Sequence, residues 1–173
     1  TQPDARALTA WGVVTPEEGG VVRLGSARVE VPPGAVRRKA RISIRTLDDP
    51  AVLDGVLFNV TSGAPAYSFG PHGLKFGAPV RVVLPFDPGI ADSPAALSNL
   101  FTYRYDERAR RWERLPRVSV DSGARFIVSE TTHFSDMINA TLRLPEGPEP
   151  IEFDPNSIKS LGVADPLEGV AGV

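Results

Sequence analysis

Residues 19–36, GGVVRLGSARVEVPPGAV, predict a chain built from β-strands. Two runs rich in valine, at 21–24 and 27–31, flank a Gly25-Ser26 turn, which is the pattern of a β-hairpin. Pro32 and Pro33 end the second strand, because proline has no N–H group to donate to a neighbouring strand. The stretch therefore favours an all-β domain over a helical one.

The same pattern continues on both sides of this stretch. The chain carries 17 prolines and 16 glycines, which separate short apolar runs. Residues 40–46 alternate between apolar and polar, with Ile42 and Ile44 on one face. We expect further strands at 67–69, 79–85, 101–105, 112–115, 118–120 and 125–138, a candidate first strand at 11–14, and short helices only at 47–54 and 93–98. Strands of this length and spacing predict a β-sandwich or an open barrel.

The length of 173 residues corresponds to one domain with tails. We divide the chain into an N-terminal extension at 1–18, a β domain at 19–144, and a linker and extended C-terminal tail at 145–173 that leads to a following domain. Residues 145–150, PEGPEP, have the composition of a linker. Because the chain begins at Thr1 and has its only methionine at Met137, we expect a fragment or a processed form.

The composition argues against several kinds of partner and cofactor. The formal net charge of −2 gives the chain no general attraction to nucleic acid. No apolar run approaches the ~20 residues of a membrane-spanning helix, so we expect no membrane insertion. The chain has no cysteine and only two histidines, so we expect neither a thiolate nor a histidine-rich metal site, and no cofactor. The densest basic cluster, at 108–111, is flanked by acidic residues and is expected in a solvated hairpin turn.

The tripeptide His133-Phe134-Ser135 is the strongest candidate for chemistry. A histidine two residues before a serine can act as the base for that hydroxyl. Residues i and i+2 of a strand point to the same face, so we expect His133 beside Ser135. Phe134 is then expected on the opposite face, in the core.

No third member of a catalytic group is evident from the sequence. Glu130 and Asp136 share the strand parity of Phe134, so neither is well placed to orient His133. His72 lies in a Pro-His-Gly turn, where we expect it to be exposed. It reaches the tripeptide only if the fold brings that turn there.

Two blocks of sequence resemble the ZU5 domain family. Residues 19–36 combine a glycine pair, a strand and a Pro-Pro-Gly-Ala turn, as ZU5 domains do at their start. Residues 69–80, FGPHGLKFGAPV, followed by Leu84-Pro85, resemble the second signature of that family. The resemblance covers residues 19–84, and the later strands are similar only in pattern. It implies a ZU5-like β-sandwich or open barrel.

Some ZU5-type regions carry a His-Phe-Ser site and cut themselves between Phe and Ser. For this chain the resemblance implies that Ser135 attacks the Phe134 carbonyl in an N-to-O acyl shift, with His133 as the base. If active, the domain is an intramolecular, single-turnover serine autoprotease whose fragments stay associated. Donors for the oxyanion cannot be named from the sequence.

Two other interpretations stay open. In one, His133 and Ser135 form a hydrogen-bonded pair within a sheet, and the domain is a non-catalytic interaction or scaffolding module. In the other, the protein is a hydrolase that acts on a separate substrate. The second lacks support, because the sequence has no nucleophile elbow, no metal cluster and no distinctive carboxylate pair.

The tail has a shorter resemblance of its own. Residues 151–160, IEFDPNSIKS, with Ala164-Asp165-Pro166, look like the leader of large bacterial YD-repeat proteins of the Rhs or toxin-complex kind. This resemblance implies a position on the N-terminal side of a larger secreted or cell-surface bacterial protein. The expected partner is then the chain's own C-terminal fragment or the rest of that polypeptide, and an unstructured linker is the alternative.

Overall fold

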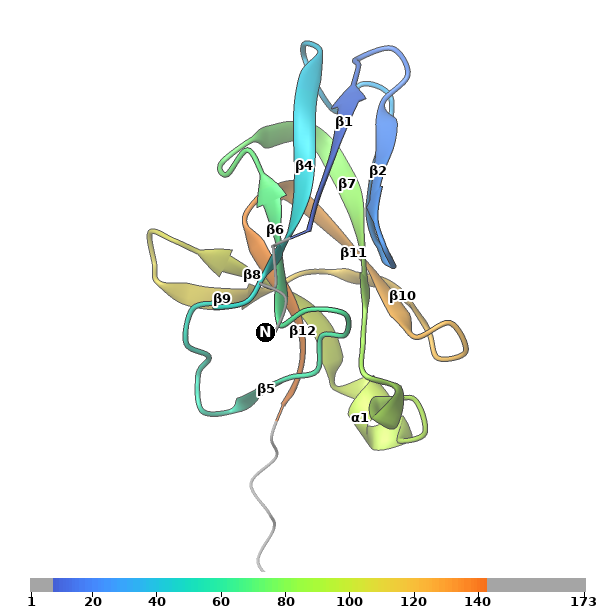
Figure 1. Cartoon of the computed structure of the whole chain (residues 1–173), viewed down its shortest axis with the longest axis vertical. Coiled ribbons are helices and arrows are strands. Elements are labelled where there is room, and N and C mark those ends of the chain that lie inside the picture. The colour runs from blue at the N-terminus through green and yellow to red at the C-terminus, as the bar shows by residue number, and fades with distance from the viewer. Residues whose placement is uncertain (1–7, 143–173) are drawn as a thin grey trace, which may run out of the picture. The chain divides into compact units, whose positions relative to one another are not determined.

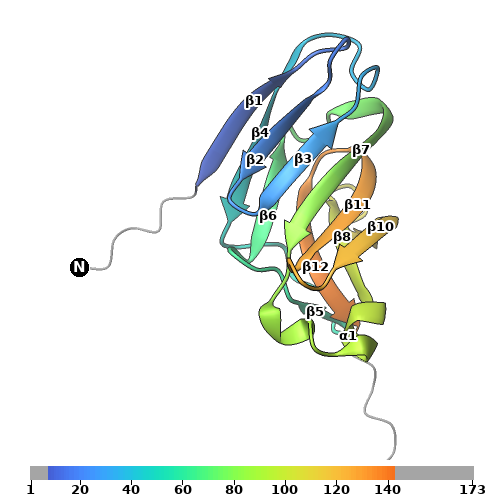
Figure 2. The same cartoon turned by 90° about the vertical axis from the view of Figure 1, so that its right-hand side faces the viewer.

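The computed structural model describes residues 8–142, which form two antiparallel β-sheets (Figures 1 and 2). The first sheet has the order β1-β4-β6-β12-β8-β9, and β5 also pairs with β12. Its strands are β1 (Thr9–Val14), β4 (Ala40–Leu47), β5 (Leu57–Asn59), β6 (Ala66–Gly70), β8 (Leu100–Asp106), β9 (Arg111–Arg114) and β12 (Asp136–Leu142). Residues 1–7 and 143–173, and with them the predicted linker and tail, lie outside the described residues.

The second sheet has the order β10-β11-β7-β3-β2. Its strands are β2 (Gly20–Leu24), β3 (Ala27–Val31), β7 (Lys75–Pro85), β10 (Arg117–Asp121) and β11 (Phe126–His133). Figure 2 shows these strands side by side in front of the first sheet. Within residues 8–142 the two sheets do not close into a barrel, so the all-β prediction is confirmed in its sandwich form.

The hairpin predicted from residues 19–36 is present as β2 and β3. A side chain at Gly19 would overlap the Val31 carbonyl, and its φ of +66° is a conformation that favours glycine. The candidate first strand is also present as β1, which pairs with β4 from Thr9 to Val14. It lies within the stretch that we assigned to the N-terminal extension.

The helix predicted at 47–54 is wrong. Strand β4 continues to Leu47, which pairs with Ala66 of β6, and the residues that follow are irregular until β5. Pro50 lacks the N–H that a helix interior needs. The second predicted helix is confirmed as α1 (Pro94–Ser98), and the Ser93 hydroxyl caps it by accepting the Ala96 N–H at 3.2 Å.

The single strand predicted at 125–138 is also wrong, and its break defines the site. Strand β11 ends at His133 in the second sheet, and β12 begins at Asp136 in the first. Phe134 and Ser135 form the corner between the two sheets, which both views show as the turn of the orange ribbon (Figures 1 and 2). The β11–β7 pairing shifts register just before this corner, between Thr131 and His133. Such irregularities bend a strand and end its pairing.

The main core lies between the two sheets. Ile42 and Ile44 are both fully buried, which confirms the alternation predicted for β4. Phe134 belongs to the same cluster and is 1% exposed. Its ring lies 5.7 Å from the ring of Phe69 and 4.8 Å from that of Phe76, between centroids. The corner is therefore anchored in the core by an aromatic cluster.

A buried asparagine links the sheets farther along β12. Asn139 accepts a hydrogen bond from the Thr102 hydroxyl at 2.7 Å, within the first sheet. Its amide nitrogen donates to the Leu84 and Pro85 carbonyls of β7, at 3.0 and 2.9 Å. The whole side-chain amide is thus satisfied by protein groups from both sheets.

Candidate functional site

A cleft of about 350 Å³ opens at the corner between β11 and β12. Three stretches line it: the turn after β6, the end of β8 with the turn that follows, and the corner itself. Its lining residues are His72, Gly73, Lys75, Arg104, Tyr105, Asp106, Glu107, Arg108, His133, Phe134 and Ser135. The fold thus brings the predicted tripeptide and the Pro-His-Gly turn to one place.

The Phe134–Ser135 peptide is held by main-chain hydrogen bonds on each side. The Phe134 N–H donates to the Leu74 carbonyl, and the Phe134 carbonyl accepts the Gly73 N–H, both at 3.1 Å. The Ser135 carbonyl accepts the Phe69 N–H at 3.1 Å. The turn after β6 therefore holds Phe134, and strand β6 itself holds Ser135.

Ser135 is 4% exposed, and its hydroxyl donates to the Tyr105 carbonyl at 2.6 Å. Among residues 8–142 no hydrogen bond joins His133 to Ser135, although both line the cleft. The strand-parity argument does not extend across this pair, because β11 ends at His133. The Ser135 hydroxyl must therefore turn from Tyr105 before a base can take its proton.

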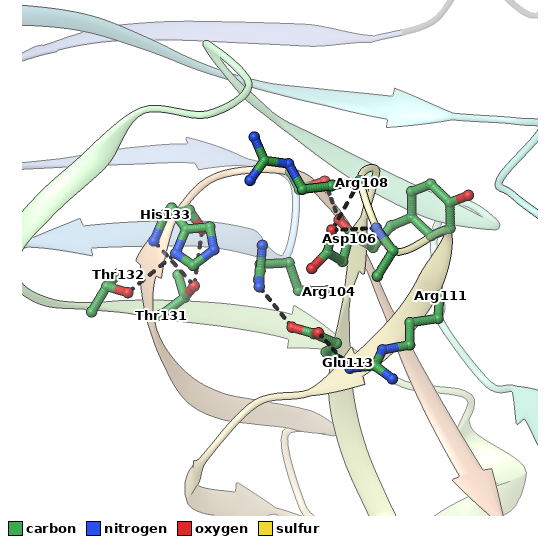
Figure 3. Close-up of polar contacts among 11 residues, drawn as sticks. Arg104, Asp106, Arg108, Arg111, Glu113, Thr131, Thr132 and His133 are labelled. Carbon is green, nitrogen blue, oxygen red and sulfur yellow. Dashed lines mark hydrogen bonds and ion pairs between the residues drawn. The ribbon is translucent and has the colours of Figure 1, made fainter.

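His133 is half-buried at the end of β11. Its Nδ1 lies 3.2 Å from the Thr132 hydroxyl. Burial lowers the pKa of His133 below its ordinary value, and the positive charges of Arg104 and Lys75 lower it further. Figure 3 shows Arg104 between His133 and Glu113, to which Arg104 donates at 2.9 Å. The lowered pKa favours the neutral imidazole, which is the form that can accept a proton.

His72 is the residue at this site that the sequence did not place. Its Nδ1 lies 2.8 Å from Glu107 Oε1, in the turn after β8. Its Nε2 lies 2.8 Å from the Ser68 hydroxyl and 3.1 Å from Asp136 Oδ1. These partners come from β6, β12 and the turn after β8, so neither strand parity nor motif spacing predicts the cluster. The only signal was the Pro-His-Gly turn itself.

The described residues offer no obvious alternative chemistry. Residues 8–142 contain no group of three or more His, Cys, Asp or Glu side chains that could hold a metal ion. A larger cleft of about 450 Å³ lies between the β3–β4 loop and β7, and is lined by basic and apolar residues such as Arg37, Arg38 and Phe76. Its lining contains no serine, threonine or histidine. In the described part of the chain, no helix is long and apolar enough to span a membrane.

Comparison with known proteins identifies no family for this chain. No protein-family model and no curated protein matches this chain. Function must therefore be argued from the corner itself. The corner combines a serine hydroxyl, a neighbouring peptide carbonyl with a main-chain donor, and a histidine whose neutral form is favoured.

Proposed function

We propose that this domain cuts its own chain between Phe134 and Ser135. The observation that carries the proposal is the position of this peptide, at a corner where its carbonyl accepts the Gly73 N–H and its serine lines a cleft. Attack by an adjacent hydroxyl requires a carbonyl that is held in place and a donor for the charge that develops on its oxygen. Both are supplied by the fold.

The reaction has two steps. The Ser135 hydroxyl turns from the Tyr105 carbonyl, and its oxygen attacks the carbonyl carbon of Phe134 while His133 accepts the proton. The bond from Phe134 carbon to Ser135 nitrogen then breaks, and the nitrogen receives the proton from His133. The product is an ester between the Phe134 acyl group and Ser135 Oγ. Water from the cleft hydrolyses this ester, which gives a carboxylate at Phe134 and restores the hydroxyl.

The fold keeps the two pieces together after the cut. Strand β12 lies between β6 and β8 in the first sheet and also pairs with β5. The piece that starts at Ser135 therefore retains the main-chain pairing of an interior strand. The Phe134 ring stays buried against Phe69 and Phe76. We expect the cut domain to remain folded and to separate only when denatured.

The test is the intact mass of the purified protein over time, measured under denaturing conditions. We expect two species, residues 1–134 and 135–173, whose masses add up to that of the chain plus one water. Hydroxylamine should accelerate the cut, because it attacks an ester far faster than a peptide. The 1–134 piece then ends in a hydroxamate, and the two masses add up to that of the chain plus one hydroxylamine. Ser135→Ala should give a single species, and Ser135→Cys should still cut, through a thioester. Ser119→Ala, an exposed serine on β10, is the matched control and should cut like the wild-type protein.

One outcome overturns the proposal. If the wild-type chain stays whole after long incubation with hydroxylamine, the corner is a structural joint. The interaction-module interpretation would then be favoured.

A further inference from the structure

The turn after β6 makes hydrogen bonds to both the N–H and the carbonyl of Phe134. Phe134 donates its N–H to Leu74 and accepts the N–H of Gly73 at its carbonyl, in two bonds of 3.1 Å. This carbonyl is the one that becomes an oxyanion when the Ser135 hydroxyl adds to it. A donor already placed on the oxygen needs no reorganisation as the charge develops, and its hydrogen bond strengthens when the acceptor becomes anionic.

Gly73 can present its N–H in this direction because it has a φ of +80°. Glycine adopts this conformation without strain, whereas residues with a Cβ do so rarely. A Cβ at Gly73 would meet no atom within 4 Å, so the requirement for glycine is one of backbone conformation rather than space. The direction of the N–H thus depends on the conformation of an exposed turn.

His72 fixes that turn. One ring nitrogen contacts Glu107 at 2.8 Å, beyond the end of β8, and the other lies 3.1 Å from Asp136 Oδ1, at the start of β12. Asp136 Oδ1 is buried and makes no hydrogen bond with any described residue, so the His72 ring is the polar group placed to compensate it. The residue before Gly73 is thereby tied to both sides of the cleft.

We propose that the Gly73 N–H is the catalytic donor to the oxyanion, and that His72 is the positioning residue that holds this N–H on the Phe134 carbonyl. This assignment rests on the proposed self-cleavage. It gives the cleft two histidines with separate tasks. His133 moves a proton, and His72 keeps the turn in place.

The kinetic test compares cleavage rates of position-72 variants in the full chain. Loss of one complete oxyanion donor slows an enzyme by about 10²–10³-fold. His72→Ala loosens the donor without removing it, so we expect a loss on the order of 10- to 100-fold. In His72→Gln the side-chain amide can take the place of His72 Nε2 next to Ser68 and Asp136, so this variant should recover part of the rate. The melting temperature of each variant separates slower chemistry from a less stable fold.

A second variant tests the same positioning role while His72 stays in place, which covers the case that His72→Ala does not fold. The Glu107 side chain is 62% exposed, so Glu107→Ala should fold normally while it removes one anchor of the ring. We expect it to cut several-fold more slowly than the wild-type protein. Glu17→Ala, an exposed glutamate in the turn between β1 and β2, is the matched control and should cut at the wild-type rate.

The spectroscopic test measures the scalar coupling across the hydrogen bond from Gly73 nitrogen to the Phe134 carbonyl carbon. It is made in the Ser135→Ala background, where the chain stays whole. We expect this coupling to weaken or vanish when His72→Ala is added. The coupling from Phe69 nitrogen to the Ala carbonyl at 135 should persist as the internal control, because that bond is made by β6 and not by the turn.

The outcomes separate this assignment from the proposed function. If the wild-type protein cuts and His72→Ala cuts equally fast, the assignment is wrong and self-cleavage stands. A Gly73 coupling that is unchanged by His72→Ala also contradicts the positioning role. If the wild-type protein never cuts, both the function and the catalytic role of Gly73 are lost.

Discussion

Two polar clusters connect the sheets of this domain, and they differ in how completely their hydrogen bonds are satisfied. Asn139 is fully buried, and its amide oxygen and nitrogen are paired with Thr102, Leu84 and Pro85. At the corner, by contrast, Ser135 donates to a carbonyl at the edge of a cleft, and Asp136 Oδ1 makes no hydrogen bond within residues 8–142, although His72 Nε2 lies 3.1 Å from it. Both clusters lie on or beside the same strand, β12.

We expect the fully paired cluster to contribute to stability and the partly paired cluster to allow a reaction. A buried network in which every group is paired is rigid, and removing one member leaves its partners unsatisfied. A hydroxyl with one partner beside an open cleft can change partner more easily than a member of a fully paired buried network. Hence Asn139 is expected to hold the sandwich together, and the corner is expected to be where its chemistry occurs. The following changes test this division, in order of decreasing effect.

The largest effect is expected for His133→Gln on the rate of self-cleavage. A general base contributes about 10²–10⁴-fold, so the rate should fall by that factor. His133 is half-buried, and among the described residues its ring makes a hydrogen bond only with the neighbouring Thr132 hydroxyl, so the melting temperature should change little. The rate is measured by intact mass. A His133→Gln protein that cuts at the wild-type rate would remove His133 from the mechanism.

Asn139→Ala should have the largest effect on stability. The Pro85 carbonyl keeps the Ser62 N–H, at 3.1 Å, as a partner. The change removes the three buried hydrogen bonds of the Asn139 amide, and a buried polar group left without a partner costs about 1–3 kcal/mol. Since their combined cost is relieved in part by water, we expect a loss of roughly 3 kcal/mol in the free energy of unfolding. Urea denaturation in the Ser135→Ala background measures it on an uncut chain. Asn99→Ala, whose amide hydrogen bond to the Ala95 carbonyl is near the surface, is the control and should lose far less.

Ser135→Ala should barely change stability. It removes one hydrogen bond, from the Ser135 hydroxyl to the Tyr105 carbonyl, which is worth about 1 kcal/mol. The same urea experiment measures this change, with the wild-type protein analysed before it is cut. If the free energy of unfolding falls as much as for Asn139→Ala, the corner also supports the fold. The two clusters would then not differ in their contribution to stability.

The smallest effect is expected from Lys75→Gln on the pH dependence of cleavage. The rate should rise with pH as His133 loses its proton, with its midpoint below the ordinary histidine pKa of 6.5, because burial and the charges of Arg104 and Lys75 lower the pKa of His133. Removing the Lys75 charge should move the midpoint upward, and neutralising Arg104 should move it further. Rates measured across the acidic range test this order, with the exposed Lys39→Gln as control. A midpoint that moves to lower pH in Lys75→Gln would contradict the expected effect of the Lys75 charge on the pKa of His133.

Much of the sandwich follows from local pattern. The alternation of Ile42 and Ile44 and the Gly25-Ser26 turn depend on neighbouring residues, and the structure confirms the strands that they predict. The break at 134–135 could not be predicted in this way. Nothing in the local pattern of residues 125–138 reveals that the chain leaves one sheet for another.

The candidate site was predictable only in part, for the same reason. The tripeptide stands out in the sequence, and the burial of Phe134 was expected and is observed. The contact between His72 and Glu107 spans 35 residues and depends on the order of β6, β12 and β8 within the first sheet. The Tyr105 carbonyl and the Gly73 N–H are main-chain groups, which have no sequence signature at all.

The position of β12 also sets the order in which this site comes into existence. Strand β12 is the last described element of the chain, yet it pairs with β6 and β8, whose residues precede it by tens of positions. Pairings of such long sequence separation form late in folding. During synthesis β6 and β8 must wait for residues 136–142 to emerge before the first sheet is complete. The cleft at the corner is therefore assembled only once residues 136–142 have joined the sheet, so the proposed self-cleavage cannot begin on a shorter nascent chain.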